Sequence, residues 1–485
     1  MKHVYVKATL LVLVLLSLCI VGTIVTIFAS PNRASDLFAV VSNRSPNEAI
    51  RYVERRLIGH DKLQVLLVPP LKAFQRRLER ATGDGRILTL GKGQQTTGLA
   101  KARKVDADIV VSTGEQLILA VRDAKPGITI EVAPGVYKFA NRVQLGNAGT
   151  SDFPVTIRAA IPGTSILEFS SQEGFLVAQP YWVFDGLVIR GTCRLDKDCE
   201  HAFHVVGAGH HTTIRNNYLE NFNAHIKVNG FGGVWPDHGL VSFNTMTNTH
   251  PRQTVLPVTP FDLVGASHWR FQDNLVTNFT KQGGNNVAFG IFMKGASEGG
   301  RIERNLVICS LSEISRPGAR VGISFGGGGS FPKNICRDGS CKRFEHSHGM
   351  VANNVVAHCN DAGIDINNSA NISVYHNTLI NTSGIEIRQA PAEAHLHGNI
   401  YEGGIRVRDR ATLKQDKNQA IQAVDVFQNP ALLNLEWRKQ AESVPSTVSV
   451  PKDFCDRPRA SITQVGALAT SSTCKTTQLE KYAKP

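Results

Sequence analysis

Short runs of β-branched residues alternate with Asn and Gly from about residue 105 onward, and helical periodicity largely disappears there. Seven of these runs are centred on an asparagine and look alike: IRNNYL at Asn217, SFNTMT at Asn244, FQDNLV at Asn274, IERNLV at Asn305, VANNVV at Asn354, VYHNTL at Asn377 and LHGNIY at Asn399. Their successive spacings are 27, 30, 31, 49, 23 and 22 residues, and 49 fits two coils or one coil with an insertion. The chain therefore carries an internal repeat.

A repeat of this length, built from short strands and tight turns, predicts an all-β parallel β-helix. Each coil gives one strand to each of several parallel sheets, and stacking of the coils buries a continuous apolar interior. The repeated asparagine is expected to occupy the same corner of successive coils and to form a hydrogen-bonded ladder. Propellers and immunoglobulin-like arrays need longer strands and hairpins, which the pattern lacks.

Both ends of this repeating body have a distinct pattern. Gly114-Glu115-Gln116 leads into a predicted short amphipathic helix that ends near Pro126-Gly127 and caps the open first coil, and ITIEVAPGVY and FPVTIRAAIPG predict the first two coils. The β-helix is expected over residues 105–430. Residues 431–485 are predicted to form a C-terminal cap and tail.

The N-terminal region contains a long apolar segment instead of the β-rich repeats. Residues 8–29 contain no charged side chain, and an apolar run of about 20 residues can span a bilayer as a helix. We expect residues 1–30 to be an uncleaved signal anchor that makes a single-pass membrane protein with its body in the periplasm or outside the cell. A cleaved signal peptide and a secreted protein are the alternative. Residues 31–104 are predicted to be a basic helical neck, broken at Pro69-Pro70, and a linker.

The charge distribution argues against nucleic acid as a partner. The 485 residues hold 53 Lys+Arg and 40 Asp+Glu, a net +13. Residues 31–104 contribute 15 − 6 = +9 and Lys2 and Lys7 another +2, which leaves 36 − 34 = +2 for residues 105–485. The body is nearly neutral, and the basic excess lies beside the membrane segment.

Cysteine usage favours an oxidising compartment. Apart from Cys19 in the apolar segment, eight cysteines remain, and their spacing suggests the pairs Cys193–Cys199, Cys336–Cys341 and Cys455–Cys474. Four disulfides are expected. A zinc site is the weaker alternative, because no C-x2-C repeat is present.

The entry into the body (STGEQL, AKPGITIEVAPGVY and FPVTIRAAIPG, within 111–163) resembles the chondroitinase B and alginate lyase family, polysaccharide lyase family 6. The resemblance covers roughly residues 105–430 and implies a right-handed, single-stranded parallel β-helix. It implies β-elimination from an acidic polysaccharide, with Lys294 in GIFMKG and Arg320 in ARVGISF at the places of the catalytic lysine and arginine. Calcium is the cofactor of some members, but the acidic residues expected before the lysine are absent here (NNVAFGIF).

These residue types suit removal of the C5 proton of a uronic acid. A lysine with a lowered pKa is a general base, and an arginine binds the substrate carboxylate with its planar fork. Because stacked strands lie about 4.8 Å apart, Lys294 and Arg320 on adjacent coils are expected to be near in space. Ordinary surface residues are the alternative interpretation.

Further polar residues in this half are candidates for sugar binding. His225, Lys227 and Asn229 alternate in HIKVNG and are expected on one strand face. Asp237, His238 and Arg252 follow and complete the candidate substrate-binding set. His346, close to His348, is a candidate general acid, and the two histidines could also share a zinc ion. The metal-binding residues, if any, are unknown.

The leading hypothesis is a membrane-anchored polysaccharide lyase acting on a uronate polymer. A uronate C5-epimerase, which starts with the same proton removal, and a non-catalytic polysaccharide-binding β-helix are the alternatives. The acids missing before Lys294 favour the binding protein, whereas the Lys294/Arg320 pair and the local histidines favour the enzyme. The sequence leaves the oligomeric state open.

Overall fold

The computed structural model describes residues 63, 65–71, 73, 107–311, 318–328, 336–447 and 449–470. The chain forms two compact units, Met1–Asp84 and Gly85–Pro485. In the first, residues 65–71 are helical through Pro69 and Pro70, so the predicted break there is wrong. A proline ring fixes φ at a value that a helix also uses. No helix among the described residues is both long and apolar enough to cross a membrane, and the predicted segment 8–29 lies outside them.

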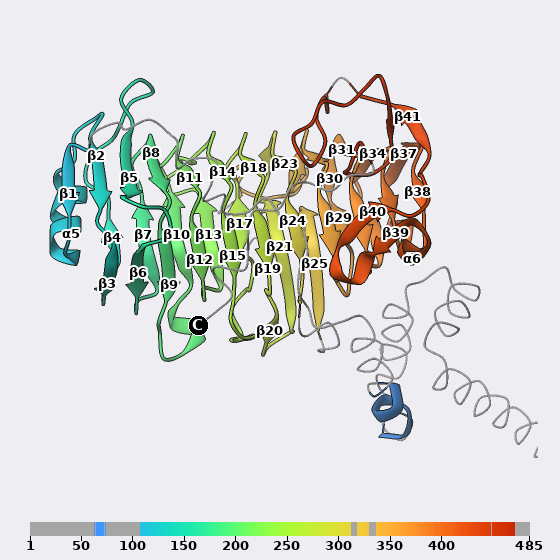
Figure 1. Cartoon of the computed structure of the whole chain (residues 1–485), viewed down its shortest axis with the longest axis horizontal. Coiled ribbons are helices and arrows are strands. Elements are labelled where there is room, and N and C mark those ends of the chain that lie inside the picture. The colour runs from blue at the N-terminus through green and yellow to red at the C-terminus, as the bar shows by residue number, and fades with distance from the viewer. Residues whose placement is uncertain are drawn as a thin grey trace, which may run out of the picture. The chain divides into compact units, whose positions relative to one another are not determined.

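Three long parallel sheets make up the second unit (Figure 1). The twelve-stranded sheet contains β1 (Ile109–Val111), β2 (Thr129–Val132), β5 (Val155–Ala159), β8 (Trp182–Asp185), β11 (Thr213–Arg215), β14 (Leu240–Ser242), β18 (Arg270–Gln272), β23 (Arg301–Glu303), β27 (Met350–Ala352), β31 (Ile372–Tyr375), β34 (Glu393–His397) and β37 (Thr412–Asp416). The eleven-stranded sheet contains β3 (Gly135–Phe139), β6 (Ser165–Phe169), β9 (Val188–Gly191), β12 (Tyr218–Glu220), β15 (Thr245–Thr247), β19 (Leu275–Thr277), β24 (Leu306–Ile308), β28 (Val355–Ala357), β32 (Thr378–Ile380), β35 (Ile400–Tyr401) and β38 (Gln419–Ala420).

The ten-stranded sheet contains β4 (Val143–Gln144), β7 (Glu173–Val177), β10 (His201–Val206), β13 (Ala224–Asn229), β17 (Phe261–Val264), β21 (Val287–Lys294), β25 (Ala319–Phe325), β29 (Ile364–Asn367), β33 (Gly384–Arg388) and β36 (Gly404–Arg408). Each coil gives one strand to each sheet, as the repeat predicted. The protein is a right-handed parallel β-helix, and connections between parallel strands are almost always right-handed.

Smaller elements decorate the coils. Parallel pairing joins β16 (Arg252–Gln253) to β20 (Lys281–Gln282), and β22 (Ser297–Glu298) to β26 (His346–Ser347) and β30 (Ser369–Ala370). Two antiparallel pairs follow near the C-terminus, β39 (Phe427–Asn429) with β40 (Asn434–Trp437) and β41 (Ser443–Pro445) with β42 (Ile462–Gln464). Short helical turns are η1 (Asp196–Asp198), α6 (Ala423–Val426) and η3 (Pro430–Leu432).

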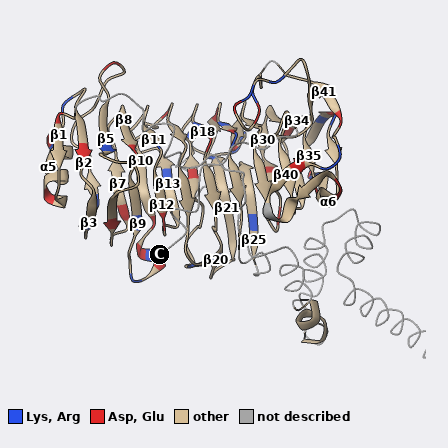
Figure 2. Ribbon diagram, in the orientation of Figure 1, with Lys and Arg blue, Asp and Glu red and all other residues tan. Residues whose placement is uncertain are grey.

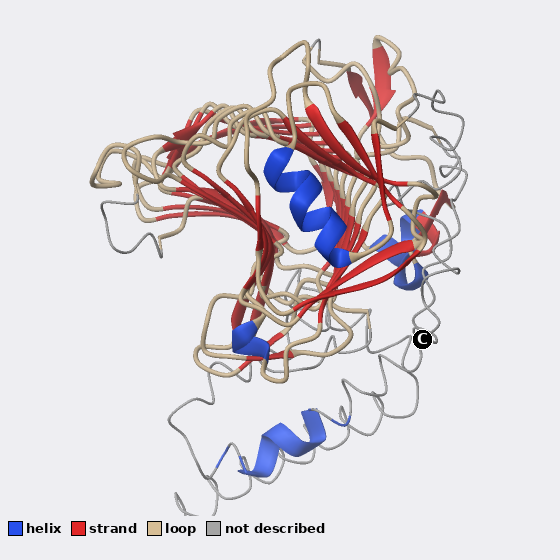
Figure 3. Ribbon diagram, turned by 90° about the vertical axis from the view of Figure 1, so that its left-hand side faces the viewer, coloured by secondary structure: helices blue, strands red, loops and turns tan. Residues whose placement is uncertain are grey.

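The predicted cap helix is α5 (Gly114–Asp123), which lies across the first coil (Figure 3). Thr113 caps its N-terminus by accepting a hydrogen bond from the Gln116 backbone N–H, and the Gln116 side chain reaches back to the Ser112 backbone N–H. This is a variant of the capping box. The buried face of α5, which includes Leu117 and Val121, closes the apolar interior at this end.

The C-terminal segment packs against the outer face of the eleven-stranded sheet. Phe427, Leu435 and Phe454 belong to the same buried cluster as the outward-facing Leu306 and Val355. The expected cap therefore covers the side of the last coils, with apolar side chains on both partners.

The predicted asparagine ladder is confirmed. From Asn217 to Asn399 each side-chain amide donates to the Oδ1 atom of the asparagine one coil onward, at 3.0–3.1 Å for Asn217 through Asn377 and 2.8 Å for Asn399. The last of these bonds reaches Asn418, which the sequence pattern had not included. The same Oδ1 atoms also accept the backbone N–H of the asparagine one coil earlier, so each amide satisfies buried donors that the turn leaves without a strand partner.

Three disulfides lie among the described residues. Cys193–Cys199 and Cys336–Cys341 confirm two predicted pairs, and Cys309–Cys359 joins two coils. Cys455 is also disulfide-bonded, and its predicted partner Cys474 lies outside the described residues. Figure 2 shows basic and acidic residues interspersed over the coils, in keeping with the nearly neutral body.

Candidate functional site

One side chain from each of eight consecutive strands of the ten-stranded sheet, β10 to β36, falls in a common outward row. The parallel register aligns His204, Lys227, Asp262, Phe292, Ser324, Asp365, Glu386 and Arg406. A second row, two residues further along the strands, contains Asn229 and Lys294. Inward-facing neighbours such as Val228 and Leu263 are fully buried in the core, because successive side chains of a strand point to opposite faces.

Lys227, Asp262 and Lys294 form an ionic group, here called the Lys–Asp–Lys cluster. Asp262 accepts a hydrogen bond from Lys227 Nζ at 2.5 Å, and its other oxygen lies 3.5 Å from Lys294 Nζ. The Lys294 ammonium also stands 4.1 Å from the centre of the Phe292 ring. Both amines thus share one carboxylate, and the Glu345 carboxylate also acts on Lys294 by raising its pKa.

Burial decides the electrostatics of this cluster. Burial lowers the pKa of Lys294 below its usual value; Asp262 opposes the change and the Lys227 ammonium adds to it. For Asp262, burial alone would raise the pKa, but the two ammonium groups outweigh it and hold that pKa far below its usual range. Asp262 is therefore a fixed anion, and Lys294 is the lysine that loses its proton more readily than a surface lysine.

A second polar group lies beside the cluster. His204 Nδ1 bonds Glu173 Oε1 at 2.5 Å, and His204 Nε2 bonds Asn229 Oδ1 at 2.8 Å. The Asn229 amide nitrogen donates to the Gly230 carbonyl, which fixes the amide's orientation. Both ring nitrogens of His204 thus face oxygen acceptors, and only a doubly protonated ring donates to both. The hydrogen bond from His204, with Arg142 in support, lowers the pKa of Glu173 to about 2.

The arrangement combines three chemical capacities on one outward face. The Lys227 ammonium can hold a carboxylate, the Lys294 amine with its lowered pKa can accept a proton, and an N–H of the His204 ring can donate one. His201 stands next to these groups, its ring centre 5.1 Å from that of His204, and burial is the main cause that lowers its pKa to about 3. His201 is therefore a neutral, polar side wall.

Of the predicted residues, the structure brings Lys294, Lys227 and Asn229 together. His225 shares their strand and its outward side but is fully buried, with Nε2 bonded to the Thr247 carbonyl at 2.9 Å. Burial lowers its pKa to about 3. The prediction that His225 contacts substrate is therefore wrong, because the turn after β15 covers it.

The expectation that Arg320 lies near Lys294 is also wrong. Arg320 is in register with Ala288, whereas the Gly326 backbone N–H, six residues further on, meets the coil of Lys294 by donating to the Met293 carbonyl. Six residues of extended strand correspond to about 20 Å. Arg320 is 1% exposed and belongs to the other end of the strand.

His346 does not suit the role of general acid. It is fully buried, its ring stacks on Phe325 at 4.2 Å, and Nδ1 lies 2.7 Å from Ser297 Oγ. Burial is the main cause that lowers its pKa to about 3. His348 is exposed and has its own partner, Asn371, so the two histidines do not form a zinc pair.

Three other predicted residues make contacts within the protein itself. Arg252 is buried and bonds Asn223 Oδ1 and Asp196. Asp237 accepts two hydrogen bonds from the Arg337 guanidinium, at 2.8 and 2.9 Å. His238 stacks between His211 and His268, with ring centres 5.0 Å from each. Arg252 and Asp237 are thus occupied by internal contacts.

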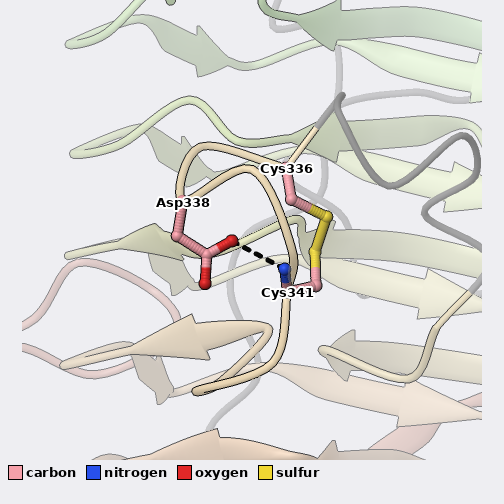
Figure 4. A group of neighbouring side chains, drawn as sticks. All are labelled: Cys336, Asp338 and Cys341. Carbon is pink, nitrogen blue, oxygen red and sulfur yellow. Dashed lines mark hydrogen bonds between the residues drawn. A yellow bond between two sulfur atoms is a disulfide. The ribbon is translucent and has the colours of Figure 1, made fainter.

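Within the described ranges, one group of side chains has the spacing of metal ligands, Cys336, Asp338 and Cys341. Figure 4 shows that the two cysteines form a disulfide and that Asp338 accepts a hydrogen bond from the Cys341 backbone N–H. The sulfur atoms are consumed in the disulfide, so this turn is not a thiolate metal site.

The sequence interpretation missed Glu173, His204 and the central place of Asp262. A usable signal was present in the strands FHV, IKV, FDL, IDI, IEI and IRV, which all carry a polar residue between two apolar ones. Aligning these triplets coil by coil gives the outward row directly, since each residue occupies the same place in its coil.

No known protein family matches the sequence, and no curated protein is detectably similar to it. Solved structures are similar in fold. Pectate lyase Pel9A is 15% identical, with 76% of this chain and 98% of that chain covered and a TM-score of 0.54. A rhamnogalacturonan lyase is 12% identical (64% and 85% covered, TM-score 0.45), and the PL6 family polysaccharide lyase Pedsa3628 from Pseudopedobacter saltans is 13% identical (74% and 99% covered, TM-score 0.35). The likeness to the pectate lyase shows the parallel β-helix fold.

Proposed function

We propose that the protein is a polysaccharide lyase that acts on a uronate-containing acidic polysaccharide. The observation that carries this proposal is the Lys–Asp–Lys cluster, which places two ammonium groups and one carboxylate on the outward face of the ten-stranded sheet. Burying ionic groups is costly, and replacing them with apolar residues often stabilises a protein. The Lys227 ammonium on this face suits the binding of an anionic substrate, and the buried Lys294 amine beside it suits removal of a proton.

In the proposed reaction the substrate carboxylate binds to Lys227, whose ammonium has hydrogens beyond the one given to Asp262. Neutral Lys294 removes the C5 proton, and the charge that develops on the carboxylate is stabilised by Lys227. The C4–O bond then breaks and a C4–C5 double bond forms. The departing oxygen takes a proton from the His204 imidazolium, which Glu173 holds in place.

The Lys–Asp–Lys cluster has a poor set of ligands for a calcium ion. Calcium prefers several carboxylate or carbonyl oxygens, and Asp262 is already held by two ammonium groups. Lys227 supplies the positive charge that a metal ion would bring to the substrate carboxylate. We therefore propose a metal-independent reaction, and expect that treatment with a chelator leaves turnover unchanged.

The test is incubation of the full chain with polygalacturonate, alginate and chondroitin sulfate while the ultraviolet absorbance of the unsaturated product is followed. Lys294→Ala should lower kcat by roughly two to four orders of magnitude, the scale of a lost general base. Lys281→Ala is the matched control, because Lys281 is also buried but bonds Val255 O and Asn285 away from the cluster. Undiminished activity of a folded Lys294→Ala variant would falsify the assignment.

The same experiment separates the alternatives. An epimerase gives no unsaturated product but exchanges the C5 hydrogen with deuterium from solvent, and a binding protein does neither while retaining the polymer. The proposal further includes attachment to the membrane through residues 8–29, with the β-helix outside the cytoplasm. Reporter fusions after residue 40 that are active only outside the cytoplasm would support this placement.

A further inference from the structure

A tight hairpin presents two apolar side chains to solvent next to the proposed site. Residues 231–234 form a two-residue turn in which the Phe231 and Val234 backbones exchange hydrogen bonds at 2.9 and 3.1 Å. Gly232 and Gly233 have φ values of 61° and 78°, the left-handed pair of a type I′ turn. Phe231 is 76% exposed and Val234 is 50% exposed.

Trp235 and Arg337 hold the backbone at the base of the hairpin. The Trp235 ring lies directly on the backbone of Gly230, where an added Cβ would come within 2.5 Å of Trp235 Nε1. The Arg337 guanidinium stands 5.4 Å from the centre of the same ring and is fixed by its two hydrogen bonds to Asp237. The Arg337 backbone N–H also donates to the carbonyl of Gly295, the residue after Lys294. The backbone that carries Phe231 is thus fixed in place, while the ring itself extends into solvent.

The position of the hairpin relates it to the site. Phe231 follows Asn229, the acceptor of His204 Nε2, by two residues, which corresponds to roughly 7 Å along an extended strand. Gly207, three residues after His204, lies beside it, since a Cβ there would be 3.5 Å from Phe231 Cβ. Single exposed apolar residues are common on protein surfaces, so it is the place of this ring beside the site, rather than its exposure, that suggests a ligand.

We propose that Phe231 is a substrate-binding residue that stacks on the apolar C–H face of a sugar ring, one unit away from the uronate held by the Lys–Asp–Lys cluster. This inference rests on the proposed function, since it names how the acidic polysaccharide is held beside the reacting unit. A single ring of this size matches a single pyranose ring. The hairpin contributes affinity and position, and no proton passes through it.

The test compares Phe231→Ala with Phe231→Trp and Phe153→Ala on whichever of polygalacturonate, alginate or chondroitin sulfate the wild type binds. Phe153 is the matched control, an equally apolar ring that is 62% exposed on the turn before β5. Phe231→Ala should raise Kd, by titration calorimetry, and KM about three- to tenfold, the scale of an aromatic contact, with a smaller change in kcat. Phe231→Trp should restore binding, and Phe153→Ala should leave Kd unchanged.

The outcomes distinguish this inference from the proposed function. If the wild type binds and cleaves a polymer but Phe231→Ala binds it as tightly, the stacking role is overturned and the lyase proposal stands. An equal weakening by Phe153→Ala would also overturn it, because the effect would then be nonspecific. If the wild type neither binds nor cleaves any of the three polymers, both proposals fail.

Discussion

Lys294 shows how a single residue acquires chemistry from its surroundings. Its side chain is 9% exposed, and the charged form of a lysine is disfavoured without water. Asp262 partly restores the charged form, whereas the second ammonium, Lys227, works against it. The balance leaves an amine with a lowered pKa beside a fixed cation, which is the combination that proton removal next to a carboxylate requires.

The pH dependence of turnover should report this balance. A base acts when deprotonated, so kcat/KM should rise as the pH rises through the pKa of Lys294. Lys227→Met removes a positive neighbour and should move the rising limb to higher pH, while Asp262→Asn removes the group that raises this pKa and should move it to lower pH. The measurement is the pH–rate profile of each variant. Shifts in the same direction for both variants would contradict the assignment of Lys294 as the base.

His204 likewise depends on its immediate hydrogen-bond partners. Its partners Glu173 and Asn229 are oxygen acceptors that orient the ring, and in the proposed reaction a ring N–H gives its proton to the leaving oxygen. His204→Gln should lower kcat by roughly two orders of magnitude on a polymer with a poor leaving group. Activity should be restored largely on a substrate whose leaving group needs no proton, such as an aryl uronide, and the comparison of the two substrates is the measurement. Equal losses on both substrates would exclude the role of proton donor.

At the scale of the element, the asparagine ladder connects the coils. Each amide donates to the asparagine one coil onward and accepts a backbone N–H from the coil before. These groups are fully buried through the middle of the stack, where an unpaired donor costs about 1–3 kcal/mol. The ladder is thus a run of coupled hydrogen bonds, and its interior asparagines should contribute more to the free energy of unfolding than the last one.

Removing one interior amide should therefore destabilise the protein strongly. Asn305→Ala leaves the Asn274 backbone N–H without its acceptor, and we expect the free energy of unfolding to fall by about 3 kcal/mol. Asn418→Ala, at the half-buried end of the ladder, should cost about 1 kcal/mol. Urea denaturation followed by circular dichroism measures both. Equal, small shifts of the two midpoints would show that the ladder does not stabilise the stack.

On the scale of the whole molecule, the two ends of the β-helix differ. The first coil is closed by α5, whereas β36, β37 and β38 form the edges of the three sheets, with no further described strand beside them. Between residues 404 and 420 the last coil carries five Lys or Arg and two Asp. Charged side chains on an edge strand oppose pairing with another chain.

Removal of these charges should promote association. Replacing Arg408 and Lys414 by Val lowers the charge of the last coil and extends its apolar surface beside Val407, which is 43% exposed. We expect the double variant to form dimers or larger species in analytical ultracentrifugation. Arg270→Val, on the interior strand β18, should leave the sedimentation of the protein unchanged. An unchanged double variant would show that the edge charges do not control association.

The repeating architecture was predictable from the residues alone, because each coil carries local signals that need no distant partner. The repeated asparagine and its β-branched neighbours predicted the stack and the ladder, and the amphipathic pattern after Gly114 predicted α5. Cys193–Cys199 and Cys336–Cys341 were also predictable, since each pair closes a short turn. Lys294 was found through a family resemblance, and Lys227 and Asn229 through their alternation on one strand.

The contacts among the polar residues, by contrast, depend on the tertiary structure. The coils differ in length, so a residue one coil later in sequence need not be level with its predecessor, and Arg320 consequently lies about six residues of strand from the level of Lys294. His204, Lys227 and Asp262 are 23 and 35 residues apart in sequence, yet strand register makes them neighbours. His225 and His346 look like surface histidines in sequence, but turns and a Phe325 ring that fold over them make them parts of the framework.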